Sequence, residues 1–280
     1  MMQRLLVLLA LVGCSQAFFD LWGGPSWDGL AVTWGPNPLS SVYFSQLPRT
    51  ESDAQSSGWT KVSDCSETGF FRGKQYMKDN DPSAIVLFGK NGYIAGLQTG
   101  VPAAKNWPTP SMKFKSNFNY DAANNLMVQT AYFVPPRDIC SAGRSSDQYS
   151  NEGTGTNLYL QQGPDPVANS VMIPKMEKDI GNTMWTKGNC FVTMGQHYWY
   201  DLRDDMPLDE FYPAFLLYNA GELNAFGWAM NVNLDSPRYE HPTPSVFDKF
   251  MARVPTVLQT VDQLSTMHIY MDDYPLLNIC

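Results

Sequence analysis

Residues 195–201, Gly-Gln-His-Tyr-Trp-Tyr-Asp, bring an imidazole, a carboxylate and three aromatic rings together at short spacing. In an extended segment, side chains alternate between two faces, so His197, Trp199 and Asp201 would share one face. An imidazole beside a carboxylate can act as a general base near neutral pH. We therefore predict His197 and Asp201 as candidate catalytic residues. The neighbouring side chains are the candidate ligand-binding residues: Gln196, Tyr198, Trp199 and Tyr200.

A structural role competes with this catalytic interpretation, because a histidine among aromatic residues is commonly a partly buried, hydrogen-bonded group. A zinc site built from the three histidines, His197, His241 and His268, would have enough ligands but lacks HExxH-type spacing. The acidic segments 79–81 and 201–205 offer oxygen ligands to calcium, although neither fits an EF-hand loop and solvated turns explain them equally well. We predict no metal site, with calcium as the alternative cofactor.

The chain contains an internal repeat, which decides how its organisation is predicted. Residues 47–61, LPRTESDAQSSGWTK, align without a gap to residues 173–187, IPKMEKDIGNTMWTK. The identical pairs are Pro48/Pro174, Glu51/Glu177, Asp53/Asp179, Trp59/Trp185, Thr60/Thr186 and Lys61/Lys187. Further landmarks follow in the same order in both copies: Cys65/Cys190, Gly73–Asp79/Gly195–Asp201, Pro108–Ser111/Pro242–Ser245 and Ile139–Cys140/Ile279–Cys280. We predict two homologous lobes, residues 18–148 and 149–280, packed about a pseudo-twofold axis.

The three histidines all lie in the second copy, where the alignment places them opposite Gln75, Trp107 and Ala131. Residues that both copies share are expected to serve the fold. A functional site is therefore expected where the residues of one copy differ from those of the other. The shared Trp-Thr-Lys is predicted to be scaffold, with each tryptophan anchoring a core and each lysine extending outward.

Short apolar and β-branched runs bounded by Gly, Pro and Asn predict a β-rich chain, all-β to α+β. The predicted strands are 42–44, 85–88, 93–95, 126–134, 158–160, 215–218 and 226–228. Asn91-Gly92 and Ala220-Gly221 predict tight hairpin turns. Short helices are predicted near the C-terminus, where Ser245 to Asp248 has a capping-box pattern and Pro255 would end one helix or begin another.

Residues 1–17 have the layout of a secretory signal, with Arg4 before an apolar run and Ser15-Gln16-Ala17 as a cleavage site. We expect a secreted, extracellular chain that starts at Phe18 and has no membrane span. Four cysteines then remain, Cys65, Cys140, Cys190 and Cys280, and an even number in an oxidising compartment favours two disulfides. If the copies share a fold, the symmetric pairing is Cys65–Cys140 with Cys190–Cys280. The crossed pairing, Cys65–Cys280 with Cys140–Cys190, is the alternative.

Composition leaves two functional classes open. A net charge of −8 without a basic run disfavours nucleic acid and anionic membranes as partners. The sequence has no Gly-x-Ser-x-Gly elbow, phosphate-binding loop or dinucleotide fingerprint. The leading hypothesis is an extracellular binding or matrix-type protein, whose partner is a small molecule or a matrix component held between the lobes. The alternative is a secreted hydrolytic or oxidative enzyme that uses His197 and Asp201.

Overall fold

The structure is a computed structural model that describes residues 26–37 and 39–280. The predicted signal peptide, residues 1–17, and the predicted start at Phe18 lie outside the described residues. Within the described part of the chain, no helix has both the length and the apolar character needed to cross a membrane.

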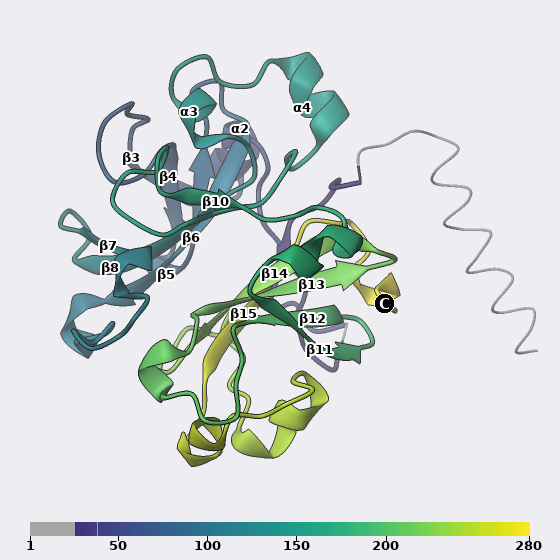
Figure 1. Cartoon of the computed structure of the whole chain (residues 1–280). Coiled ribbons are helices and arrows are strands. Elements are labelled where there is room, and N and C mark those ends of the chain that lie inside the picture. The colour runs from purple at the N-terminus through teal and green to yellow at the C-terminus, as the bar shows by residue number, and fades with distance from the viewer. Residues whose placement is uncertain (1–25, 38) are drawn as a thin grey trace, which may run out of the picture.

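The protein is β-rich, as predicted, and its strands form two antiparallel sheets (Figure 1). The first sheet has the strand order β3-β4-β5-β6-β8-β9-β10, and β7 also pairs with β8. Its strands are β3 (Trp59–Ser63), β4 (Lys74–Lys78), β5 (Asp81–Phe88), β6 (Ile94–Pro102), β7 (Phe118–Asp121), β8 (Leu126–Tyr132), β9 (Tyr159–Gln161) and β10 (Ser170–Met172).

The second sheet has the order β11-β12-β13-β14-β15-β1-β2. Its strands are β11 (Trp185–Phe191), β12 (Gly195–Tyr200), β13 (Ala214–Asn219), β14 (Glu222–Met230), β15 (Ser265–Tyr270), β1 (Ala31–Val32) and β2 (Ser45–Gln46). In each sheet, five adjacent strands follow one another in the order of the chain, β3 to β8 without β7 in the first and β11 to β15 in the second. Next to them lies a pair of short strands from the other half of the chain. Strands β1 and β2 lie in the second sheet, and β9 and β10 in the first, so residues 18–148 and 149–280 each contribute to both sheets.

The two predicted hairpin turns each contain a glycine with positive φ. Gly92, between β5 and β6, has a φ of +83°, a conformation that glycine adopts at little cost. Ala220 and Gly221, between β13 and β14, have φ values of +50° and +81°. Positive φ at both central residues is the pattern of a two-residue antiparallel turn, and Ala220-Gly221 has it. At Asn91-Gly92 only Gly92 has positive φ, and its amide donates to Gly89 O at 2.9 Å. Both turns join antiparallel partners, β5 with β6 and β13 with β14, so both hairpin predictions are confirmed.

Helical segments are short and lie outside the sheets. They are α2 (Glu51–Ser56), α3 (Pro136–Ile139), α4 (Ser146–Glu152), η1 (Ala103–Lys105), η2 (Lys115–Asn117), η3 (Glu177–Asn182), η4 (Leu208–Glu210), η5 (Pro244–Lys249), η6 (Thr256–Thr260) and η7 (Pro275–Leu277). Short helices near the C-terminus are confirmed, and η6 begins just after Pro255. The predicted capping box at Ser245 is wrong, because η5 is a 3₁₀ helix that starts one residue earlier at Pro244. Its N-cap, Thr243, makes no capping hydrogen bond through its side chain.

The predicted strand at 42–44 is also wrong. These residues form a turn, and β2 begins immediately after them. Phe44 has a φ of +52°, which is incompatible with a strand. Its amide donates to Thr33 O at 2.7 Å and its ring packs on Tyr270, with centroids 5.5 Å apart. Tertiary packing therefore overrides the β propensity of this apolar run.

The main core lies between the two sheets and contains side chains from both. Phe133 and Phe226 meet there, with ring centroids 6.2 Å apart. Trp59 and Trp185, the tryptophans of the repeated Trp-Thr-Lys, are 6% and 7% exposed in this core, as predicted for anchors. A second apolar cluster covers the opposite face of the second sheet and includes Phe247 of η5 and Leu258 of η6. The yellow-green η5–η6 segment lies below the second sheet in Figure 1, on the side away from the first sheet.

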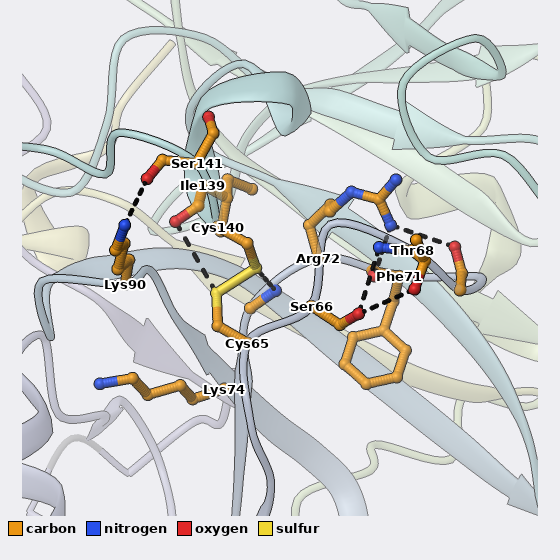
Figure 2. The surroundings of a disulfide bond; sticks show 12 residues. Cys65, Ser66, Thr68, Phe71, Arg72, Lys74, Lys90, Ile139, Cys140 and Ser141 are labelled. Carbon is orange, nitrogen blue, oxygen red and sulfur yellow. Dashed lines mark hydrogen bonds between the residues drawn. A yellow bond between two sulfur atoms is a disulfide. The ribbon is translucent and has the colours of Figure 1, made fainter.

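Both disulfides have the symmetric pairing, Cys65–Cys140 and Cys190–Cys280, and the crossed alternative is excluded. Figure 2 shows the first bridge joining the segment after β3 to the end of α3, with Ile139 and Ser141 beside it. The Gly73 amide donates to Cys140 Sγ at 3.1 Å. The bridges close separations of 75 and 90 residues, which restricts the unfolded chain strongly.

Candidate functional site

A cavity of about 490 Å³ lies between the second sheet and the η5–η6 segment. We call it the aromatic cavity, because rings form most of its wall: Trp34, Phe191, Trp199, Phe215, Phe247 and Phe250. Met194, Met251 and Leu264 add aliphatic surface. The polar residues that line it are His197, Glu240, His241, Lys249, Thr266 and His268. The space between the two sheets, where we had expected a ligand, is filled by the main core.

The wall of the cavity is built by strand alternation and fixed by hydrogen bonds. In β12, His197 and Trp199 face the cavity, while Tyr198 packs into the core on the other face. The Trp199 indole donates to Phe250 O at 3.1 Å. The side-chain amide of Asn189 donates to Asp248 O at 2.8 Å and to Met251 O at 3.2 Å. These bonds hold the end of η5 and the residues after it against the second sheet, where they form one wall of the cavity.

Glu240 and His268 form the most distinctive polar pair of the site. Glu240 accepts from the Trp34 amide at 2.6 Å and from the Thr266 hydroxyl at 2.8 Å. His268 Nδ1 lies 3.1 Å from Glu240 Oε1, and the side chains are only 7% and 14% exposed. Because an ionised carboxylate only accepts, Nδ1 carries the proton and donates. The imidazole is thereby fixed in one tautomer, as in carboxylate–histidine pairs that orient a base.

The other ring nitrogen of His268 is unusual, because Nε2 is buried and has no hydrogen-bond partner among the described residues. Buried polar atoms are normally paired, and each exception calls for an explanation. The ring packs edge-on against Phe215, with centroids 4.9 Å apart, and lies 6.1 Å from the His197 ring. An aromatic environment cannot satisfy the lone pair of Nε2.

His197 is fully enclosed in the same layer. It is 1% exposed, stacks beside Trp199 and Phe215 at centroid distances of 6.2 and 5.7 Å, and its Nδ1 donates to Asn189 O at 3.1 Å. Burial, with a smaller effect from His268, lowers the pKa of His197 from 6.5 to about 3. The imidazole is therefore neutral at physiological pH.

The structure does not bring the predicted pair His197 and Asp201 together. Asp201 follows the end of β12, with a φ of +48°, so the strict alternation of the strand stops before it. Its carboxylate pairs with Arg203, which also binds Glu210 at 2.7 Å. Each member of the predicted pair is therefore engaged elsewhere.

Of the four predicted ligand-binding residues, Trp199 lines the cavity. Gln196 donates to Gly188 O at 2.8 Å, Tyr198 donates to Glu177 at 2.8 Å, and Tyr200 packs edge-on against Trp185 with ring centroids 5.3 Å apart. These three side chains are tied to structural partners. The lysines of the repeat behave as predicted and extend outward to pair with acids on the surface, Lys61 with Asp64 and Lys187 with Glu177.

All three histidines line the aromatic cavity, although they are far apart in the sequence. His241 lies exposed at its rim, whereas the other two are buried. Across residues 26–37 and 39–280, no group of three or more His, Cys, Asp or Glu side chains is placed to hold a metal ion. In the segments considered for calcium, Asp81 pairs with Arg238 and Asp201 with Arg203.

Sequence reasoning missed Glu240 entirely and considered His268 only as a zinc ligand. Both residues are isolated in the sequence, with no motif around them. Their relation depends on the bridge between Glu240 and Thr266, which aligns the segment before η5 with β15. A useful signal was the concentration of histidines in the second half of the chain.

The face of the first sheet that points away from the main core carries a buried polar network between two small apolar clusters. Gln75 donates to Gln98 at 2.9 Å, Gln98 donates to Thr130 at 2.9 Å, and the Ser63 hydroxyl donates to Gln75 at 2.8 Å. A connected, buried hydrogen-bond network of this kind is a structural solution that leaves no free acceptor for a ligand.

A smaller cavity of about 340 Å³ lies beside Arg144. The Arg144 guanidinium donates to the carbonyls of Gly153, at 2.8 Å, and Ile94, and lies 3.7 Å from the carboxylate of Glu152. Its charge is therefore used within the fold, and this cavity is a weaker candidate than the aromatic cavity.

Comparisons with known proteins give no match: no family model, curated protein or solved structure matches this chain. The functional argument therefore rests on the geometry and chemistry of the aromatic cavity.

Proposed function

We propose that this protein is a secreted, disulfide-stabilised binding protein that holds a small, mainly apolar ligand in the aromatic cavity. One observation carries the proposal: a mainly apolar cavity is lined by His268, whose buried Nε2 has no partner among the described residues. Ligand sites typically combine apolar walls with a few well-placed polar groups, and volumes of roughly 300–1,000 Å³ are usual. The cavity has both properties.

An extracellular location is supported by the two disulfides, which persist in oxidising compartments, and by the signal-like residues 1–17. The ligand in this proposal is a small molecule. A matrix component is the other partner predicted from the sequence, and it would reach the protein through the rim, where His241 and Lys249 are exposed.

We further propose that residues 18–148 and 149–280 are homologous repeats related by a pseudo-twofold axis, with their first two strands exchanged between sheets. The matching strand orders support this. So do two repeated contacts: Glu51 accepts from Tyr76 at 2.6 Å, and Glu177 from Tyr198 at 2.8 Å. Each disulfide also packs alike, with Sγ of Cys65 or Cys190 3.8 Å from the carbonyl oxygen before its partner cysteine.

The repeat supplies an internal reference for the site. Gln98 pairs with Thr130 across β6 and β8, and Gly227 pairs with His268 across β14 and β15. The strand register therefore supports an alignment in which Thr130 of the first half is equivalent to His268 of the second. The sequence comparison had suggested the next residue, Ala131. The second copy replaces a closed polar network with two histidines and a glycine. This is the departure expected where one copy has acquired a function.

The test is a cavity-filling variant with a neutral fluorescent probe, N-phenyl-1-naphthylamine. Val246 lines the cavity on η5 and is half-buried, so Val246→Trp fills space without disturbing the sheet. The control is Val192→Trp, at a valine that is 58% exposed. We expect one probe per wild-type chain, at least about tenfold weaker binding in the cavity variant, and unchanged binding in the control. Equal binding by all three proteins, or none by the wild type, would reject the proposal.

A secreted enzyme is the second candidate, and the Glu240–His268 pair favours it. A histidine oriented by a carboxylate, with its second nitrogen unpaired, is arranged to take a proton from water or a substrate. In this form the enzyme would use His268 and Glu240 in place of His197 and Asp201. The test is hydrolysis of a hydrophobic ester, p-nitrophenyl butyrate, by the wild type and by His268→Gln. If the wild type hydrolyses the ester and the variant does not, although the variant still binds the probe, catalysis by His268 is supported. If the wild type does not hydrolyse the ester, this ester-hydrolase form of the proposal is rejected.

A further inference from the structure

We propose that the aromatic cavity selects neutral, ring-containing compounds that carry a hydroxyl group, and that this hydroxyl donates to Nε2 of His268. The inference rests on the proposed binding function and specifies its ligand class. It follows from which polar groups the cavity offers and which of them are already used.

The first step is the tautomer of the two buried imidazoles. Nδ1 of His268 faces Glu240 Oε1 at 3.1 Å, and Nδ1 of His197 faces Asn189 O at 3.1 Å. Both partners are acceptors, so each Nδ1 carries the ring proton. In the neutral imidazole the other nitrogen then has a lone pair and no hydrogen. What these rings offer a ligand is therefore an acceptor, and the ligand must supply the donor.

The second step is that Glu240 cannot serve a ligand itself. Oε1 receives the Trp34 amide at 2.6 Å as well as Nδ1 of His268, and Oε2 receives the Thr266 hydroxyl at 2.8 Å. An amine ligand would need a free carboxylate in the cavity, and Glu240 is the carboxylate among the lining residues. A cationic ligand is therefore disfavoured relative to a neutral one.

The third step is the state of His268 Nε2 without a ligand. The atom is buried, and no described residue bonds it. Leaving a buried acceptor unpaired is unfavourable by an amount that corresponds to roughly tenfold or more in an equilibrium constant. Phe215 packs against the ring at a centroid distance of 4.9 Å, and both side chains line the cavity. Because Nε2 is buried, the proposal requires these two rings to move apart when a ligand hydroxyl bonds it.

The fourth step is shape. Trp199 and Phe215 stack beside His197 with interplanar angles of 11° and 25°, so the planes of these rings are nearly parallel to that of the imidazole. A planar or alicyclic ring system packs well against an aromatic lining of this kind. A volume of about 490 Å³ accommodates a compound of two or three fused rings.

The experiment compares 2-naphthol with 2-methoxynaphthalene, which has the same rings but no O–H. Binding to the full-length secreted protein is measured by equilibrium dialysis near pH 7.5. We expect the wild type to bind 2-naphthol at least about tenfold more tightly. His268→Phe keeps an aromatic ring at the site and should bind the two compounds equally. The control, Val192→Trp, changes an exposed valine outside the cavity lining and should keep the preference.

The outcomes separate this inference from the binding function. If wild-type protein binds neither naphthalene nor the neutral probe used above, the proposed function fails. If it binds both naphthalenes equally, or if His268→Phe retains the preference, the binding function stands and the hydroxyl inference is refuted. Should the variant misfold, ¹⁵N NMR of wild-type His268 decides: 2-naphthol must shift the Nε2 resonance and the ether must not.

Discussion

The burial of His197 predicts that the folded protein loses measurable stability in mild acid. Burial and the nearby His268 lower the pKa of His197 to about 3 in the folded protein, against an ordinary value of 6.5. Between these values the unfolded chain takes up a proton that the folded protein does not. Stability is therefore unaffected above pH 6.5 and decreases as the pH falls from 6.5 towards 3. Replacing His197 with glutamine removes this titration.

The size of the effect follows from the difference in pKa. Each pH unit below 6.5 costs about 1.4 kcal/mol, so at pH 5.0 the proton uptake destabilises the wild type by about 2 kcal/mol relative to pH 7.5. For a chain of this length, that corresponds to a decrease of about 4–8 °C in melting temperature. Glutamine can donate to Asn189 O as the imidazole does, so the fold should be retained.

The assay is urea unfolding of the wild type and His197→Gln at pH 7.5 and 5.0. The quantity tested is the difference between the two proteins in their change with pH, because titrating groups remote from His197 contribute equally to both. We expect the wild type to lose about 2 kcal/mol more than the variant between the two pH values. Parallel pH profiles would show that His197 is accessible to protons in the folded protein, and the reasoning from burial would be refuted.

Three further predictions concern the surroundings of the cavity and the scaffold. Burial raises the pKa of Asp272 to about 6, so the folded protein loses stability relative to the unfolded chain as the pH rises from 3.8 through 6. Asp272→Asn should therefore be more stable than the wild type at pH 7.5, by up to about 3 kcal/mol. In urea unfolding this advantage should vanish near pH 4. Gly227→Ala would place a Cβ 2.1 Å from the Phe215 ring, so we expect a loss of about 1–3 kcal/mol and weaker probe binding, which normal binding would contradict. The double variant Cys190→Ala/Cys280→Ala should lose about 3–5 kcal/mol in the same assay, and an unchanged unfolding midpoint would show that the bridge adds nothing.

Local features of the fold were predictable because they depend on nearby residues. The turns at Gly92 and Gly221 follow from the conformational freedom of glycine, and the strands around them follow from short apolar runs bounded by turn residues. The similarity between residues 47–61 and 173–187 favoured the symmetric disulfide pairing, which the structure has, but left the crossed pairing open. Polar strands such as β3 and β4 were missed, since their side chains are stabilised by cross-strand partners and not by an apolar pattern.

Predictions about the candidate site were less complete, because its geometry is made by distant segments. His197 and Trp199 were found through the aromatic segment that contains them, and both line the cavity. Asp201 was paired with His197 on the assumption that the strand continues, but β12 ends at Tyr200. Glu240 was missed because its partner, His268, is 28 residues away and reaches it only through the pairing with β15.

By itself, the sequence indicated a β-rich chain and four cysteines for two disulfides, and it favoured the symmetric pairing over the crossed one. These properties depend on residue type and spacing, which a linear chain records directly. The tertiary structure alone decided that the first two strands of each half join the sheet of the other half, and that three distant histidines and Glu240 meet around one cavity. Both results depend on which distant segments pair with one another, and such pairing joins residues that are far apart in the chain.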